Sequence, residues 1–185
     1  MKLLIVPSGR RSWSCNVTDG AGTQVATTSA AKRAGLCGFL PEVDGLISMS
    51  NGAPAAVLRV EPHSRKNWVL MDAGGRRLAT TRSTGEKVYV TFARSGVTVR
   101  WARAGAWHRH LEALRHQGKG GQKLSTQPLG TFKRTRGRCD CAAEFDDGAL
   151  SVEAQLFLTW LGVQLLRDTP QSCEGVGVEE VGACG

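Results

Sequence analysis

The chain lacks the compositional extremes that would place it in a special structural class. Only 6% of its residues are aromatic and one is a tyrosine, while 41% are hydrophobic and 22% are charged. These proportions are close to globular averages and argue against a disordered chain. With 185 residues, the chain has the length of one ordinary domain and can bury a core without disulfides or metals.

No secretory signal is evident. The apolar run Leu3–Val6 ends at Pro7 and is soon followed by Arg10 and Arg11, so it is too short for the hydrophobic region of a signal peptide. The six cysteines are scattered rather than arranged in a disulfide framework. We therefore expect reduced thiols and a cytoplasmic protein, with peripheral attachment to a membrane surface as a further option.

Motifs for catalysis are also lacking. No Gly-x-Ser-x-Gly motif, phosphate-binding glycine loop or local Cys–His signature occurs. The metal-like groupings are His108-x-His110 with His116, and Cys139-x-Cys141. Neither has the Cys-x-x-Cys spacing of a structural zinc site, and the histidines fit a basic surface better. We expect no enzyme, no bound metal and no cofactor.

Acidic residues are almost absent between residues 94 and 138. Glu112 is the one carboxylate there, against eleven basic residues: Arg94, Arg100, Arg103, Arg109, Arg115, Lys119, Lys123, Lys133, Arg134, Arg136 and Arg138. The net charge of the whole chain is +8. Such a field attracts phosphates on lipid headgroups or nucleic acid. The alternative is a solvated basic face that only keeps the protein soluble.

The chain is instead rich in turn signals. The pattern Asp-x-x-Gly-x-x-apolar occurs at residues 19–25 and again at 72–78, each time after a short alternating run that contains a tryptophan. Aspartate accepts hydrogen bonds from the turn backbone, and glycine supplies the positive φ that tight turns need. Both segments are therefore predicted to be β-hairpins. They arose either by duplication of one unit or by chance.

Further strands are predicted at Ala55–Val60, Thr131–Arg134 and Cys139–Phe145. The clearest hairpin joins Lys87–Phe92 to Val97–Trp101 through a turn at residues 94–96. Residues 106–116 are ambiguous, because Trp107, Leu111 and Leu114 have helical spacing while Trp107 and Leu111 also fit a strand.

From Leu150 to Leu166 the pattern changes to that of a helix. Residues 156–163 are apolar on every side, which is typical of a helix buried in protein or lipid. Seventeen residues reach about 25 Å, less than a bilayer span requires, and Glu153, Gln155 and Gln164 further disfavour insertion. A buried helix and no transmembrane span are predicted.

Repeated hairpins followed by one hydrophobic helix resemble the tubby C-terminal-like superfamily, which includes the phospholipid scramblases and the LURP-one-related proteins. Residues 19–25 and 72–78 match the hairpin motif of that superfamily, and Glu144–Leu166 matches its last strand and helix. The resemblance implies a mainly β protein, a closed antiparallel β-barrel of hairpins around the C-terminal helix. The predicted organisation is an N-terminal extension at 1–11, one domain at 12–168 and a flexible tail at 169–185.

The sequence departs from the scramblases in two respects. It lacks their cysteine-rich palmitoylation cluster and their proline-rich N-terminal region, so lipid scrambling and permanent anchoring are not implied. The Lys/Arg pair with which tubby proteins hold phosphoinositides has no identifiable match, and no binding residue is carried over.

The leading functional hypothesis is a non-catalytic binding module that recognises anionic membrane lipids or another phosphate-bearing partner. The predicted contacts are Lys133, Arg134, Arg136 and Arg138, with Lys119 and Lys123 on the neighbouring loop. Arg134, Arg136 and Arg138 recur at period two, so on a strand they would share one face and suit phosphate oxygens. A charged edge strand that blocks aggregation would show the same pattern.

Two other classes of function stay open. The first is a nucleic-acid-binding domain, in which Trp101, Trp107 and Phe132 would stack on bases between the basic residues. The strand pattern favours a core position for these aromatic side chains. The second is a scaffold protein whose charge is incidental.

Overall fold

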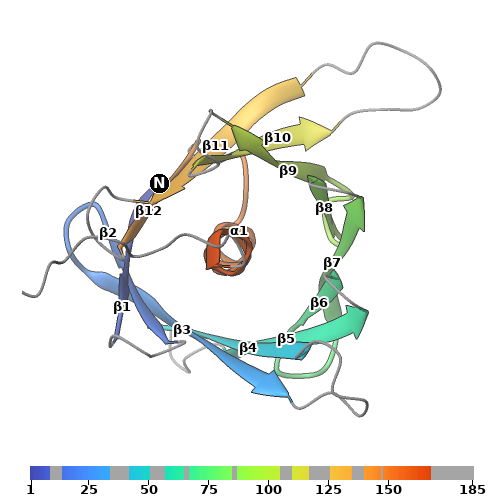
Figure 1. Cartoon of the computed structure of the whole chain (residues 1–185), viewed down its shortest axis with the longest axis horizontal. Coiled ribbons are helices and arrows are strands. Elements are labelled where there is room, and N and C mark those ends of the chain that lie inside the picture. The colour runs from blue at the N-terminus through green and yellow to red at the C-terminus, as the bar shows by residue number, and fades with distance from the viewer. Residues whose placement is uncertain are drawn as a thin grey trace, which may run out of the picture.

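Twelve antiparallel strands close into a barrel around one helix (Figure 1). The computed structural model describes residues 1–8, 14–33, 42–50, 57–64, 67–84, 87–104, 110–116, 126–134, 140–146 and 148–167. The strands are β1 (Lys2–Pro7), β2 (Cys15–Asp19), β3 (Gln24–Arg33), β4 (Glu42–Met49), β5 (Val57–Ser64), β6 (Asn67–Met71), β7 (Arg77–Thr84), β8 (Lys87–Phe92), β9 (Thr98–Ala104), β10 (His110–His116), β11 (Thr126–Arg134) and β12 (Cys141–Phe145), and the helix is α1 (Val152–Arg167). This confirms the predicted fold class.

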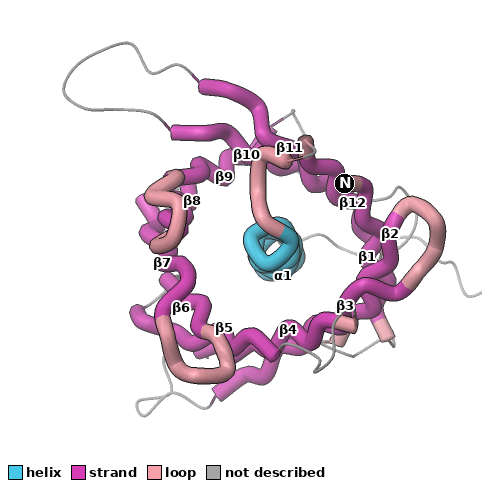
Figure 2. Tube along the Cα trace, turned by 180° about the vertical axis from the view of Figure 1, so that it is seen from behind, coloured by secondary structure: helices cyan, strands magenta, loops and turns pink. Residues whose placement is uncertain are grey.

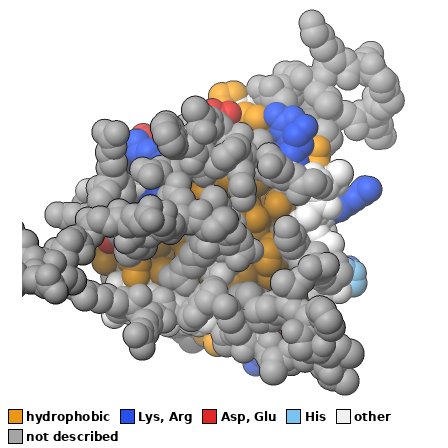
Figure 3. Space-filling view, viewed as in Figure 1, with side chains coloured by type: hydrophobic (Ala, Val, Ile, Leu, Met, Phe, Trp, Pro, Cys, Tyr) orange, Lys and Arg blue, Asp and Glu red, His pale blue; other side chains and the backbone are white. Residues whose placement is uncertain are grey.

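The strands form because apolar and polar residues alternate along them. In β8, Val88, Val90 and Phe92 are buried inside the barrel, while Lys87 and Tyr89 point outward. Successive strands repeat this division, so the inner faces line a continuous core. Figure 3 shows hydrophobic side chains gathered within the ring of strands, with lysine and arginine side chains towards its outer margin.

The first strand corrects the predicted domain boundary. β1 pairs with β12 on one side and with β2 on the other, so Ile5 lies opposite both Cys141 and Val17. Leu3 and Ile5 are buried in the core. Residues 2–7 therefore close the barrel, and the prediction that residues 1–11 form an extension outside the domain was wrong. The predicted tail at 169–185 lies outside the described residues.

The ambiguous segment is a strand where it is described. β10 pairs with β9 and β11 along its length, with Leu111 and Ala113 buried and Leu114 on the outer face. The helical spacing of Leu111 and Leu114 is therefore incidental. Trp107 lies outside the described residues.

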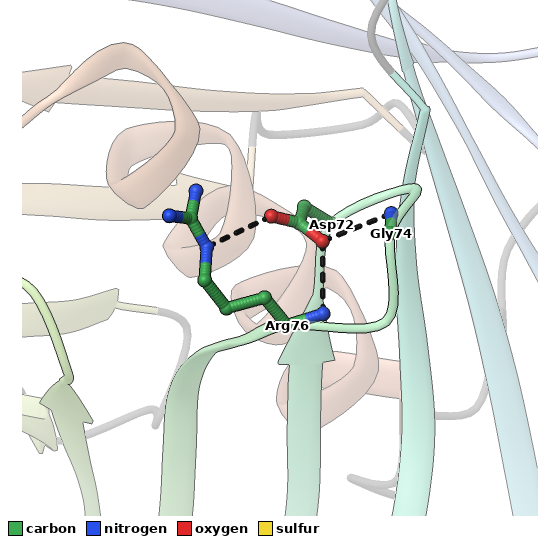
Figure 4. Close-up of polar contacts among 3 residues, drawn as sticks. All are labelled: Asp72, Gly74 and Arg76. Carbon is green, nitrogen blue, oxygen red and sulfur yellow. Dashed lines mark hydrogen bonds and ion pairs between the residues drawn. The ribbon is translucent and has the colours of Figure 1, made fainter.

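Both predicted Asp-x-x-Gly turns are present, and they have the same hydrogen bonds. The Asp19 Oδ1 atom accepts from the backbone N–H groups of Ala21 and Thr23, each at 2.9 Å. In the second turn, the Asp72 Oδ1 atom accepts from Gly74 at 3.0 Å and from Arg76 at 2.9 Å (Figure 4). The fourth turn residue is a glycine with φ of 84° in the first turn and 78° in the second. A register shift follows each turn, so the hairpins are equivalent in detail.

The helix occupies the centre of the barrel, and the segment that leads into it runs inward from β12 (Figures 1 and 2). Ser151 caps its first turn, because the Ser151 side chain accepts from the backbone N–H of Ala154 at 3.3 Å. Every residue from Ala154 to Gln164 is buried. The predicted buried helix is thus confirmed. In the described part of the chain, no helix has the length and apolarity needed to cross a bilayer.

Two glycines allow the helix to approach the barrel wall. A Cβ atom at residue 45 of β4 would lie 2.7 Å from the Trp160 ring of α1. A Cβ atom at residue 162 of α1 would lie 2.9 Å from the Phe132 ring of β11. Trp160 also donates from Nε1 to the Ser29 carbonyl at 3.1 Å and packs edge-on against Trp68, with ring centroids 5.8 Å apart. The helix is therefore held at a fixed height and rotation.

We predict that Gly45→Ala destabilises the protein by about 1–3 kcal/mol, because the added methyl group overpacks the contact with Trp160. The cost should be smaller in a Trp160→Leu background, where the indole ring is missing. Chemical denaturation of the four proteins in this cycle measures the coupling. Gly20→Ala is the control, since its Cβ would have no heavy atom nearer than 3.9 Å. An equal loss of unfolding free energy in the two backgrounds would show that residue 45 is not energetically coupled to Trp160.

A second prediction concerns pH. The pKa of Asp72 is lowered from its usual 3.8, mainly by the hydrogen bond from the Arg76 backbone N–H and also by the Arg76 guanidinium, whose Nε atom lies 3.0 Å from Oδ2. A depressed pKa in the folded state contributes stability above the unfolded-state pKa, and this contribution is lost as pH falls through the folded-state pKa. Asp72→Asn should therefore lower the unfolding free energy at neutral pH, and the difference from wild type should shrink on acidification. NMR titration of the carboxyl group should give a midpoint below 3.8. A midpoint above that value would contradict the assignment.

Candidate anion-binding surface

The barrel has two distinct ends, and the course of the chain defines them. At the helix-entry end, α1 begins and the described turns 20–23, 72–76 and 93–97 connect strands. At the helix-exit end, α1 finishes at Arg167. Because neighbouring strands are antiparallel, odd-numbered strands run from the entry end to the exit end, and even-numbered strands run back.

Two of the six predicted contact residues lie in the described part of the chain. Lys133 and Arg134 are the last residues of β11, at the helix-exit end. Lys133 is exposed on the outer face, whereas Arg134 is half-buried and shares the inward alternation of Phe132. Adjacent residues of this strand thus point to opposite faces. Arg136, Arg138, Lys119 and Lys123 lie outside the described residues.

The structure places only part of the expected grouping of these residues. Lys119 and Lys123 fall in sequence between His116 and Thr126, and both of those strand termini lie at the helix-entry end. The nine residues of β11 separate Thr126 from Arg134, which corresponds to about 27 Å of extended strand. Lys119 and Lys123 themselves lie outside the described residues, so their grouping with Lys133 and Arg134 stays a prediction.

Protection of a strand edge does not explain the charge on β11. The strand pairs with β10 on one side and with β12 on the other, and the closed barrel leaves no edge among the described strands. Charges that block edge-to-edge aggregation are needed only where backbone groups lack partners. The basic residues at this end therefore need a different explanation.

The two ends differ in charge. Each end consists of the residues of its described turns and loops together with those within one residue of a described strand or helix terminus. At the helix-exit end, these are the basic residues Lys32, Arg33, Lys87, Arg103, Lys133, Arg134 and Arg167 and the acidic residues Glu42 and Asp140. At the helix-entry end, they are the basic residues Lys2, Arg76, Arg77, Arg94 and Arg115 and the acidic residues Asp19, Asp72, Glu144, Asp146 and Glu153. The exit end is basic, and the entry end is balanced.

A second basic feature lies on the outer face of β7, β8 and β9. Arg82 and Arg100 are the cross-strand neighbours of Tyr89, one on each side, and we call these three residues the tyrosine row. Arg82 is exposed, whereas Tyr89 and Arg100 are half-buried. Sequence reasoning did not assign these residues to a site. The hairpin predicted at 87–101 could have indicated part of this row, because its turn places Tyr89 opposite Arg100.

The aromatic side chains expected to stack on bases are buried wherever the structure describes them. Trp101 is 1% exposed and Phe132 is fully buried, and the two rings pack against each other inside the barrel with centroids 6.3 Å apart. This agrees with the core position that the strand pattern favoured. Stacking of nucleic-acid bases on Trp101 or Phe132 would require the barrel to open.

The metal-like residues are dispersed. His110 and His116 stand at opposite ends of β10, about 20 Å apart along an extended strand, so they cannot bind one ion. Cys141 and Cys15 are buried and take no part in a disulfide. Within the described ranges, no group of three or more His, Cys, Asp or Glu side chains is placed to hold a metal ion. His108 and Cys139 lie outside these ranges.

Comparison of the chain with protein-family models, with curated proteins and with solved structures found no match.

Proposed function

We propose that the protein is a non-catalytic module that binds anionic membrane surfaces through the helix-exit end of its barrel. The observation that carries the proposal is the difference in charge between the two ends. Among the residues that the structure describes, basic ones exceed acidic ones seven to two at the exit end and are balanced by them at the entry end. A charge spread evenly over the surface would serve solubility, whereas a charge gathered at one end creates a directed field.

The arrangement suits a flat partner. The basic residues belong to β3, β8, β9, β11 and α1, which lie around and inside the ring, so the charge surrounds the barrel end rather than lining a groove. An anionic bilayer attracts each lysine or arginine near its surface with about 1 kcal/mol. Several such residues on one rim would orient the barrel with its axis perpendicular to the membrane surface.

The helix dipole accounts for only part of this charge. The C-terminus of α1 lies at the helix-exit end and carries a partial negative charge equivalent to about −0.5. Arg167 in the last helical turn is sufficient to offset it. The remaining basic residues exceed what stability of the helix requires, which supports an external anionic partner.

Two further points favour a lipid surface over nucleic acid. The buried Trp101 and Phe132 rings leave no described aromatic platform for bases in the basic segment. The barrel around a C-terminal helix is also the architecture that the resemblance to the tubby C-terminal-like superfamily implies, and that superfamily includes lipid-associated proteins. A cytoplasmic protein that attaches reversibly to a membrane fits both points.

The test is vesicle flotation at physiological salt with matched charge removal. Lys32, Arg33 and Lys133, all at the exit end, are changed to glutamine together. We expect vesicle affinity to fall on the order of 100-fold, from about 1 kcal/mol for each residue. Thermal stability should change little, because Lys133 is exposed and all three residues lie at strand ends.

The control removes three exposed arginines, Arg59, Arg77 and Arg94, which lie away from the helix-exit end. The control has the same net charge as the first variant and should keep vesicle affinity within about twofold. Equal losses in the two variants would mean that net charge, not the exit end, governs binding. Failure of the wild-type protein to float with anionic vesicles, together with a mobility shift of RNA or DNA, would overturn the proposal.

A further inference from the structure

The tyrosine row combines features that a solvated basic surface does not need. Neighbouring strands lie about 4.8 Å apart, so Arg82 and Arg100 stand about 10 Å from each other, on either side of Tyr89. Lys87 precedes Tyr89 by two residues and shares its outward face. Three positive charges thus surround the single tyrosine of the chain.

No described carboxylate offsets these charges through an ion pair. Among the residues that the structure describes, none of Arg82, Lys87 and Arg100 forms a salt bridge. Arg100 is half-buried, and its Nε atom is shielded from solvent without a hydrogen-bond partner. A shielded donor on a charged group is costly to leave unsatisfied and calls for an acceptor.

We infer that the tyrosine row is a binding site for a phosphomonoester group. This inference rests on the proposed function, since it names the chemistry that one part of the basic surface recognises. The guanidinium groups approach from two sides, and a monoester offers three terminal oxygens to them, whereas a diester offers two. Guanidinium forks bind such oxygens through paired, charge-assisted hydrogen bonds. The Tyr89 ring supplies a face on which a guanidinium can stack.

A second row on the barrel lacks these features and serves as a natural control. Arg59 and Arg77 are the cross-strand neighbours of Met71, one on each side, with a register shift beside the Met71–Arg77 pair; we call these residues the methionine row. Both of its arginines are exposed, and its centre has no aromatic ring face. Ordering two exposed arginines costs more conformational entropy than ordering one exposed and one half-buried arginine, as in the tyrosine row. The methionine row should therefore bind phosphate poorly.

The experiment measures binding of glycerol 3-phosphate by calorimetry and of vesicles that contain either phosphatidic acid, a monoester, or phosphatidylglycerol, a diester. Arg82→Gln with Arg100→Gln should weaken glycerol 3-phosphate binding at least tenfold and abolish the preference for phosphatidic acid. Arg59→Gln with Arg77→Gln should leave the glycerol 3-phosphate affinity and the preference for phosphatidic acid within about twofold of the wild-type values. Arg100→Lys keeps the charge and the packed stem but loses the fork, so it should still weaken binding roughly tenfold.

Tyrosine variants separate stacking from hydrogen bonding. Tyr89→Phe keeps the ring and should bind glycerol 3-phosphate nearly as wild type does. Tyr89→Leu should lower the affinity for glycerol 3-phosphate about fivefold. Because these side chains lie on the outer face, circular dichroism should show all variants folded.

The outcomes distinguish this inference from the proposed function. If the wild type floats with anionic vesicles but the tyrosine-row variant binds both lipids and glycerol 3-phosphate unchanged, the inference fails and the proposed function stands. If glycerol 3-phosphate binding depends on Arg100 but no vesicle is bound, the site is correct for a soluble phosphate and membrane binding is wrong. If the methionine-row variant loses as much glycerol 3-phosphate affinity as the tyrosine-row variant, charge alone accounts for binding and the inference fails.

Discussion

The lumen of a twelve-stranded barrel has to be filled, and the rest of the structure depends on how this is done. About eight strands enclose a space that inward side chains can fill, so a wider barrel needs additional material in its centre. Here the material is α1, whose apolar side chains face the wall in all directions. Trp160 fixes its position through the close approach at Gly45 and the hydrogen bond to Ser29. The direction of the helix also makes the two ends of the barrel different, and the proposed binding surface lies at the end where the helix finishes.

The sequence predicted the local elements well where a physical signal was strong. The Asp72 turn, the alternation in β8 and the apolar stretch at 156–163 of the helix each contain a pattern that few other structures satisfy. The strand β1 was missed because its apolar run is short and was considered only as the hydrophobic region of a signal peptide, for which it is too short. Its role depends on pairing with β12, far away in the sequence. Long-range pairing leaves no local trace, so the residues that close the barrel could not be identified.

The predicted site shows a similar division. The basic character of Lys133 and Arg134 was visible, but their opposite orientations depended on the register of β11 with its neighbours. A bulge in that strand adds a residue near Leu129, so that both Leu129 and Phe132 point inward although they are three positions apart. Simple alternation fails at such a point. The tyrosine row needed the registers of two hairpins at once, and only the folded barrel supplies both.

The order of elements has a consequence for the newly made chain. The strand that closes the barrel is synthesised first, and the helix that fills it is synthesised last. A chain still on the ribosome therefore has β1 without its β12 partner and inward faces without their helix. Such non-local pairings form slowly and leave apolar surface and strand edges exposed in the meantime. The barrel can accordingly close only once α1 has been synthesised, and we expect the supply of chaperones that hold nascent chains to limit the yield of this protein in cells.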